Sequence, residues 1–394
     1  MSKCKEMNIN IYNIMIEYLR GQGVRAPLQG VLKRGGGGGA RFSRSGSHPP
    51  LPQTAPFFPF LLLLLVCLLM SFILLSVAAQ SASATTPVYL TVVMHNEEPS
   101  NDSQDYIKNM EFYYKSRADL KEFALMLWQK GAMLNFQTDW NFLLAVMKYD
   151  VGNVTADTNN KNILRWLVED LRFEVDPHSH GTVYNYTDIA LLISLLGVTP
   201  SRNVGGFIYE LPYGGWEGHI YGAYGLQFPD AFWQADNLWG AATIDHIGGD
   251  DTTFGVWKPK DRYNFYTHEP TQRLLYIGSG CNSFYGIKEI VIAKRSGLLN
   301  RNGFYTASIF LPQQNLGSDV IKTFAGELDF ITQYITYGEI TWKSLSQIAD
   351  IWRTQYMTPS QVVCNQLLPY FKLDQTTEYC PMKLCRRSVM ETAK

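Results

Sequence analysis

The chain has 394 residues and a formal net charge of −1, so it carries no basic excess of the kind that attracts nucleic acid. Aromatic residues make up 13% of it, including 23 tyrosines and nine tryptophans. Such rings pack on the apolar faces of sugars, and they fill ordinary cores equally well. The composition therefore argues against a nucleic-acid partner and is compatible with a carbohydrate partner.

The first 84 residues differ from the rest of the chain. Residues 1–56 include five consecutive glycines at 35–39 and are rich in Ser, Pro and Arg, so we predict a disordered leader or the product of a misassigned start codon. Residues 57–84 contain an uncharged apolar run at 60–79, followed by Ala-Ser-Ala at 82–84, which predicts a signal peptide. The run is also long enough for a transmembrane helix, so a membrane anchor is the alternative. In both cases we expect the remainder to lie outside the cell, secreted or anchored.

Strands and helices alternate in the first half of the exported part. Residues 88–94 and 133–137 are rich in β-favouring side chains and predict strands. Apolar residues at helical spacing predict one helix over 116–130, ended by Gly131, and a second over 162–169. A third strand is expected over 171–175, then a helix over 188–196 and a strand over 204–207. This alternation is typical of parallel βαβ units.

The second half is less regular. Residues 209–260 are rich in Gly, Trp and Tyr without a clear period, and we expect long loops there. Strands are expected over 274–277 and 304–310, and a helix over 344–356. The predicted fold is α/β: a (β/α) barrel over 85–360 with seven or eight strands, regular or distorted. A tail follows over 361–394, where Cys364, Cys380 and Cys385 favour a disulfide in an oxidising compartment, with Cys281 also available.

Two imidazoles and a carboxylate follow the third predicted strand, in Asp176-Pro-His-Ser-His180. Alternate residues of an extended segment point to one side, so His178 and His180 can face one pocket. Neutral imidazole is a common ligand of zinc, and the pair makes half of a metal site. A solvated loop pair is the alternative.

Ligand-type residues also follow the first two predicted strands. His95 and Glu97 come after residues 88–94, and Asp139 comes after residues 133–137. In α/β barrels the carboxyl ends of the strands carry the active site. We therefore predict a shared site in which His95, Asp139, His178 and His180 bind a divalent metal ion, zinc or a similar one.

The stretches 135–140 (Asn-Phe-Gln-Thr-Asp-Trp), 175–180 and 184–188 resemble an uncharacterised branch of the polysaccharide deacetylases (NodB-like) and related barrel glycoside hydrolases, over residues 86–356. The resemblance implies His178 and His180 as metal ligands and Asp139 as ligand or base. The chain departs from that family in two places: residues 95–98 are His-Asn-Glu-Glu where the family has Thr-Phe-Asp-Asp, and its histidine pair is spaced by one residue instead of three. His95 and Glu97 are therefore assigned from position alone.

The expected activity is metal-dependent hydrolysis of a polysaccharide or glycan, most simply deacetylation. Asp139 or Glu97 would take the proton of the attacking water, and His268 or His246 would protonate the leaving group. Two alternatives stay open. A metal-independent barrel glycoside hydrolase would use two carboxylates among Glu97, Asp139 and Asp176. A catalytically silent barrel would only bind carbohydrate.

Overall fold

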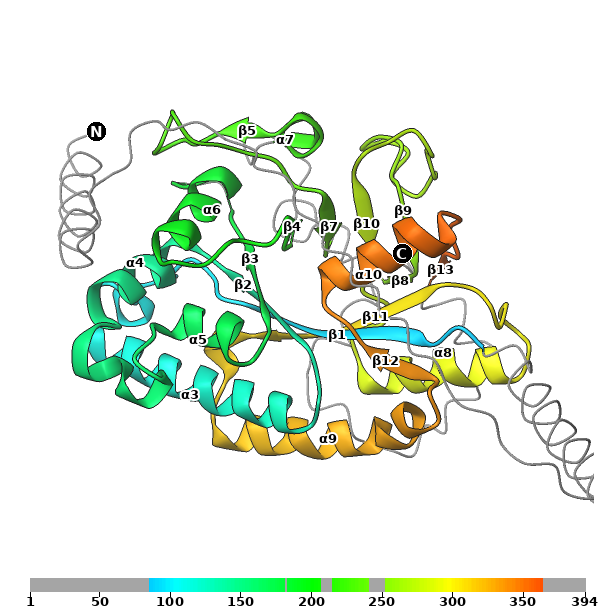
Figure 1. The fold of residues 1–394 in the computed structure, drawn as a ribbon, viewed down its shortest axis with the longest axis horizontal. Coiled ribbons are helices and arrows are strands. Elements are labelled where there is room, and N and C mark those ends of the chain that lie inside the picture. The colour runs from blue at the N-terminus through cyan, green and yellow to red at the C-terminus, as the bar shows by residue number, and fades with distance from the viewer. Residues whose placement is uncertain (1–84, 181–182, 207–214, 241–251, 364–394) are drawn as a thin grey trace, which may run out of the picture. The chain divides into compact units, whose positions relative to one another are not determined.

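The computed structural model describes residues 85–180, 183–206, 215–240 and 252–363 (Figure 1). The described residues from Thr86 onward belong to one compact unit. The predicted leader at 1–56, the signal peptide or anchor at 57–84 and the tail from 364 lie outside the described residues, so those predictions stay untested. Within the described ranges no helix is both long and apolar enough to cross a membrane. Cys281 is disulfide-bonded, and the other five cysteines lie outside these ranges.

The central sheet is parallel and is organised around strand β1 (Val88–His95), all of whose residues are buried. Strand β11 (Tyr305–Pro312) pairs with β1 over its whole length. On the other edge, β12 (Ile340–Trp342) pairs with the first three residues of β1, and β2 (Leu134–Thr138) pairs with the last four. Strand β3 (Glu174–Pro177) continues the sheet beyond β2. The carboxyl ends of β1, β2, β3 and β11 therefore lie at the same edge of the sheet, near His95.

Helices cover one face of this sheet, as Figure 1 shows for α3 (Met110–Gln129), α5 (Ile163–Glu169), α8 (Phe284–Arg295) and α9 (Ser318–Thr336). Alternate residues of β1, such as Leu90 and Val92, belong to the apolar core on this side. Helix α9 turns Ile321, Phe324, Leu328 and Ile331 inward at helical spacing. The opposite face of β1 packs on a second sheet and on helix α10 (Leu345–Ile351) through a separate cluster that includes Tyr89 and Val93.

The second sheet consists of very short strands. Its order is β4 (Asn203–Val204), β7 (Asn237–Trp239), β10 (Leu275–Ile277) and β9 (Val256–Trp257), the first three parallel and the last antiparallel. A single bridge, His178 with Gly205, links it to β3, and the Ser308 amide donates to the Ser279 carbonyl near β10. Strand pairing among the described residues forms these two sheets and two further pairs of short strands, and no closed barrel is detected among them. The predicted α/β class with a parallel central sheet is confirmed, and the barrel itself stays a prediction.

The remaining described elements lie between or after these. They are α4 (Trp140–Tyr149), α6 (Tyr186–Leu195), α7 (Gly215–Tyr221), β5 (Ala223–Tyr224), β6 (Phe232–Trp233), β8 (Thr253–Phe254), β13 (Val362–Val363), a π-helix at Trp352–Tyr356 after α10, and 3-10 turns at Asp102–Gln104, Gly152–Thr158 and Gln313–Asn315.

Most predicted elements in the first half are confirmed, with shifted ends. Helices α3, α5 and α6 lie where the spacing predicts them, and Gly131, with a φ of 67°, follows the end of α3. Strand β3 starts at Glu174 instead of 171, because Arg172 has a left-handed φ of 64° that a strand does not allow. The described part of 209–260 contains short elements where we expected loops only, and α4, α8 and α9 were not predicted.

Candidate metal centre

The candidate site lies at the carboxyl end of the central sheet. In the parallel register His95 pairs with Gln137, and Gln137 pairs with Asp176. Residues in register on neighbouring strands point to the same face, so these side chains form one row. His178 follows two residues after Asp176 and therefore points to the same side. Ligands bind at this edge of open parallel sheets, because the strand ends and their loops meet there.

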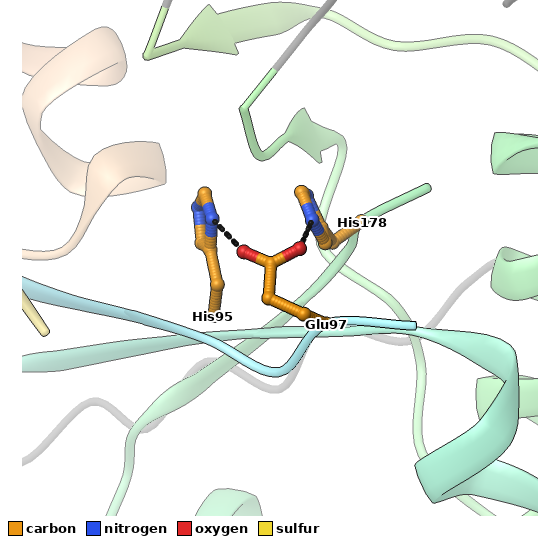
Figure 2. A group of neighbouring side chains, drawn as sticks. All are labelled: His95, Glu97 and His178. Atoms are coloured by element: carbon orange, nitrogen blue, oxygen red, sulfur yellow. Dashed lines mark hydrogen bonds and ion pairs between the residues drawn. The ribbon is translucent and has the colours of Figure 1, made fainter. Parts of the chain in front are cut away.

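Glu97 is the centre of a histidine cluster, and Figure 2 shows His95 and His178 on either side of its carboxylate. Its Oε1 lies 3.5 Å from His95 Nδ1, and its Oε2 lies 3.2 Å from His178 Nε2 and 2.6 Å from His180 Nε2. One ligand atom from each of His95, Glu97 and His178 lies within 4.8 Å of the other two. Tetrahedral zinc ligands lie about 3.3 Å apart, so these atoms would need to move closer together to share one ion.

The other nitrogen of each buried imidazole has its own partner. His95 Nε2 contacts Gln137 Oε1, and His178 Nδ1 lies 2.9 Å from the Gly205 carbonyl oxygen. The two rings stack with centroids 4.2 Å apart. Phe310 meets the His95 ring edge-on at 4.7 Å. Both imidazoles are therefore held in fixed orientations with one nitrogen directed at Glu97.

Two glycines leave the space that this arrangement needs. A Cβ on Gly205 would lie 2.2 Å from Gln137 Cδ, and a Cβ on Gly206 would lie 2.8 Å from His95 Cε1 and 3.0 Å from His178 Cε1. Gly206 also has a φ of 54°. Sequence reasoning missed Gln137, Gly205 and Gly206. The only signal for the glycines was their position inside the strand predicted over 204–207, where a glycine often marks a close approach of another group.

Burial and charge set the protonation of the ligand group. Burial, with the charge of His178, lowers the pKa of His95 to about 4, so His95 is neutral near pH 7. Burial alone would raise the pKa of Glu97, but its contacts with His178, and then with His180 and His95, hold it well below its usual range. A neutral imidazole beside an ionised carboxylate is the form in which these groups bind metals.

Asp139 is fully buried and caps helix α4, where its Oδ1 accepts from the Asn141 amide at 3.1 Å. Its Oδ2 has no hydrogen-bond partner among the described residues. Burial, and then the charges of Glu98 and Glu97, raise the pKa of Asp139 well above its ordinary value. Asp139 is not part of the group His95, Glu97 and His178, so its predicted role as ligand or base stays a prediction.

Two further predicted residues, His268 and His246, are not part of this cluster as described. His268 Nδ1 accepts from the Lys258 amide at 3.2 Å, and its ring lies edge-on to Trp352. Across the described ranges no hydrogen bond or ion pair joins His268 to Glu97 or its imidazoles, so its catalytic role also stays a prediction. His246 lies outside the described residues.

No protein-family model matches this chain, and no curated protein matches it. Three solved structures are similar to its fold at low TM-scores. One is a 4-alpha-glucanotransferase from Thermococcus litoralis, at 11% identity and TM-score 0.39 over 67% of this chain and 38% of that one. A protein described as a polysaccharide deacetylase from Mycobacterium smegmatis matches at 10% identity and TM-score 0.39, over 72% of this chain and 96% of that one. The Puue allantoinase matches at 14% identity and TM-score 0.40, over 69% and 92%.

This chain thus spans well under half of the glucanotransferase. All three TM-scores are too low to assign a fold or a function to this chain. The family resemblance noted from the sequence therefore stays a prediction.

Proposed function

We propose that the protein is a metal-dependent hydrolase in which His95, Glu97 and His178 bind one divalent ion, zinc or a similar one. The observation that supports this most directly is the convergence of two buried imidazoles on one carboxylate at the end of a parallel sheet. We add His180 as a further ligand, since it contacts the same Glu97 oxygen from the more exposed side.

Hydrogen-bond chemistry around His178 supports a cation in this place. The Gly205 carbonyl can only accept, so His178 Nδ1 carries the hydrogen. In a neutral imidazole Nε2 then has a bare lone pair, and it faces the ionised Glu97 Oε2 at 3.2 Å. Two acceptors at this distance repel unless a positive charge lies between them. That charge is either an extra proton on His178 or a bound metal ion.

A divalent ion there would supply Lewis-acid chemistry, lowering the pKa of a coordinated water and polarising a substrate carbonyl. Asp139 suits general acid–base work, because its Oδ2 lacks a partner among the described residues and its pKa is raised. The carbohydrate substrate, an acetamide or ester on a glycan, rests on the sequence resemblance and the aromatic content. Export, by signal peptide or anchor, rests on the apolar run at 60–79.

The two-carboxylate glycoside hydrolase has less support. Asp176 uses both carboxylate oxygens within the interior, where they accept from Asn135, Gln137, Ser201 and Asn203. Glu97 is hydrogen-bonded or paired with three imidazoles. Neither carboxylate is presented to a substrate as such a mechanism requires.

The test is the metal content of the purified full chain by elemental analysis. Wild type should carry about one equivalent of a divalent ion, and the His95→Ala/His178→Ala double variant should carry none. His268→Ala is the matched control and should keep the ion, because His268 lies apart from the cluster. Hydrolysis of acetylated sugars should stop on chelation and return with the ion. Wild type that stays metal-free after incubation with zinc, manganese, cobalt and nickel would reject the proposal.

A further inference from the structure

Below the candidate metal centre, the interior face of strands β2 and β3 is polar although it is fully buried. Asn135 and Gln137 alternate along β2, and Asp176 lies beside them on β3. Both Asn135 Nδ2, at 3.0 Å, and Gln137 Nε2, at 3.2 Å, donate to Asp176 Oδ2. Buried polar groups of this kind persist only when they are hydrogen-bonded, so this network fixes its members in single orientations.

The contact with Asp176 decides which way round the Gln137 amide lies. The Asp176 oxygens receive donors from four residues and act as acceptors, so the Gln137 nitrogen points to Asp176. The Gln137 oxygen then faces His95 Nε2. An amide oxygen can only accept, which requires the hydrogen on His95 Nε2. In the neutral imidazole Nδ1 is left with its lone pair, directed at Glu97.

We propose that Gln137, held by Asp176, is a positioning residue that fixes His95 in the tautomer whose Nδ1 is available to a metal ion. This inference rests on the proposed metal site. It deepens that proposal by naming the ligand atom, Nδ1 for His95 as against Nε2 for His178. Partners of this kind behind a metal-binding histidine set its tautomer and raise its basicity.

The backbone opposite Gln137 is shaped to admit its side chain. A Cβ on Gly205 would lie 2.2 Å from both Gln137 Cδ and Oε1, so any other residue there would displace the Gln137 amide. The same Gly205 supplies the carbonyl that orients His178. Gly205 therefore contributes to the orientation of both imidazoles. Its lack of a side chain leaves room for the Gln137 amide that contacts His95, and its carbonyl oxygen accepts from His178.

The first test measures the tautomers directly, by nitrogen-15 NMR of the metal-free full chain with labelled histidine. The His95 signals are assigned by their loss in His95→Gln. We expect the hydrogen on Nε2 in His95 and on Nδ1 in His178. A His95 that carries its hydrogen on Nδ1 overturns the inference, whatever the protein does with metals.

The second test compares Gln137→Leu with Asn135→Leu. Asn135 lies on the same strand and face and donates to the same Asp176 oxygen, but it does not contact His95. Zinc affinity, measured by chelator competition, should fall about 10- to 100-fold in Gln137→Leu and by less than about threefold in Asn135→Leu. Equal zinc affinities in the two variants overturn the inference. Melting temperatures of both report any general loss of packing.

The outcomes separate this inference from the proposed function. If wild type binds no zinc while His95 carries its hydrogen on Nε2, the metal site fails and the Gln137 contact is supported. If zinc binds and the His95 hydrogen lies on Nδ1, the metal site is supported and the role of Gln137 fails. Should Gln137→Leu not fold, the tautomer of wild type decides the question alone.

Discussion

The side chains of the candidate metal centre converge on the carboxylate of Glu97. Its two oxygens contact three imidazoles, of which two are buried. The contacts with these imidazoles overcome its burial and keep its pKa low, so it contributes a full negative charge. A site of two neutral imidazoles would attract a divalent ion far less without that charge.

Glu97→Gln keeps the shape of this side chain and removes its charge. Zinc affinity should therefore fall at least about tenfold, as measured by chelator competition. Glu98→Gln is the matched control. The Glu98 carboxylate accepts a hydrogen bond from Trp140 Nε1, and among the described residues no hydrogen bond or ion pair joins it to the three imidazoles. Unchanged zinc affinity in Glu97→Gln would show that the carboxylate is not a ligand.

Two substitutions of Asp139 separate its role as a helix cap from its proposed role in acid–base catalysis. Asp139→Asn retains the oxygen that accepts from the Asn141 amide and removes a charge from a buried position, so it should be at least as stable as wild type. Asp139→Ala loses the cap and should cost about 1 kcal/mol in urea unfolding. If Asp139 is the acid–base residue, both variants lose turnover of acetylated sugar while binding zinc. An active Asp139→Asn would remove Asp139 from the mechanism.

At the scale of elements, the turn after β4 shapes the site as much as any ligand does. Gly206 approaches both stacked imidazoles, and its φ of 54° adds a second reason for glycine. Gly131, with a φ of 67°, shares the backbone conformation but has no atom within 4 Å of the position of a Cβ. Substitutions at Gly131 therefore report backbone strain alone, and substitutions at Gly206 report backbone strain together with a steric clash at the site.

Gly206→Ala and Gly131→Ala should both lose about 1 kcal/mol of stability in urea unfolding, from the left-handed backbone. Only Gly206→Ala should also weaken zinc binding, because its methyl group would displace His95 and His178. Zinc affinity of the two variants, measured side by side, checks this. Equal zinc binding would mean that the imidazoles tolerate displacement and that the turn does not shape the site.

Much of the first half of the fold could be predicted because its elements are long and regular. Strand β1 and helix α3 each span enough residues for a clear pattern, and the expectation that His95 and His178 share one pocket followed from their places after parallel strands. Helix α9 was missed although Ile321, Phe324 and Leu328 show helical spacing.

Other features could not be predicted from the sequence. A two- or three-residue strand such as β4 or β7 has no measurable period, so the second sheet follows only from its tertiary pairing. Gln137 is a neutral amide with no ligand chemistry of its own. Its importance depends on the register that sets it between His95 and Asp176, and register is a property of the sheet.

At the scale of the whole molecule, Lys294 joins the starts of two neighbouring strands. Its ammonium group donates to the carbonyl of Thr86, ahead of β1, and to that of Gly303, ahead of β11, and it lies 5.0 Å from the Tyr305 ring. No carboxylate pairs with it among the described residues. Burial consequently lowers the pKa of Lys294 to about 8.

This lowered pKa gives a pH dependence with a definite sign. Between about pH 8 and the ordinary lysine value the unfolded chain binds more protons than the folded one, so folding becomes more favourable as pH rises. Wild type should gain about 2 kcal/mol relative to Lys294→Met between about pH 7.5 and pH 9.5, in urea unfolding at each pH. Burial raises the pKa of the neighbouring Tyr305, so it stays neutral in this window. A constant difference between the two proteins would show that Lys294 keeps an ordinary pKa.

The central position of β1 has a consequence for how the protein is made. The ribosome completes this apolar strand early, but its partner over the full length begins only at Tyr305, and β12 begins at Ile340. Closing so long a loop is slow, and it cannot start before those residues are synthesised. This apolar strand of the nascent chain therefore stays unpaired on one edge through much of translation, and we expect the yield of soluble protein to depend on chaperones and on the rate of synthesis.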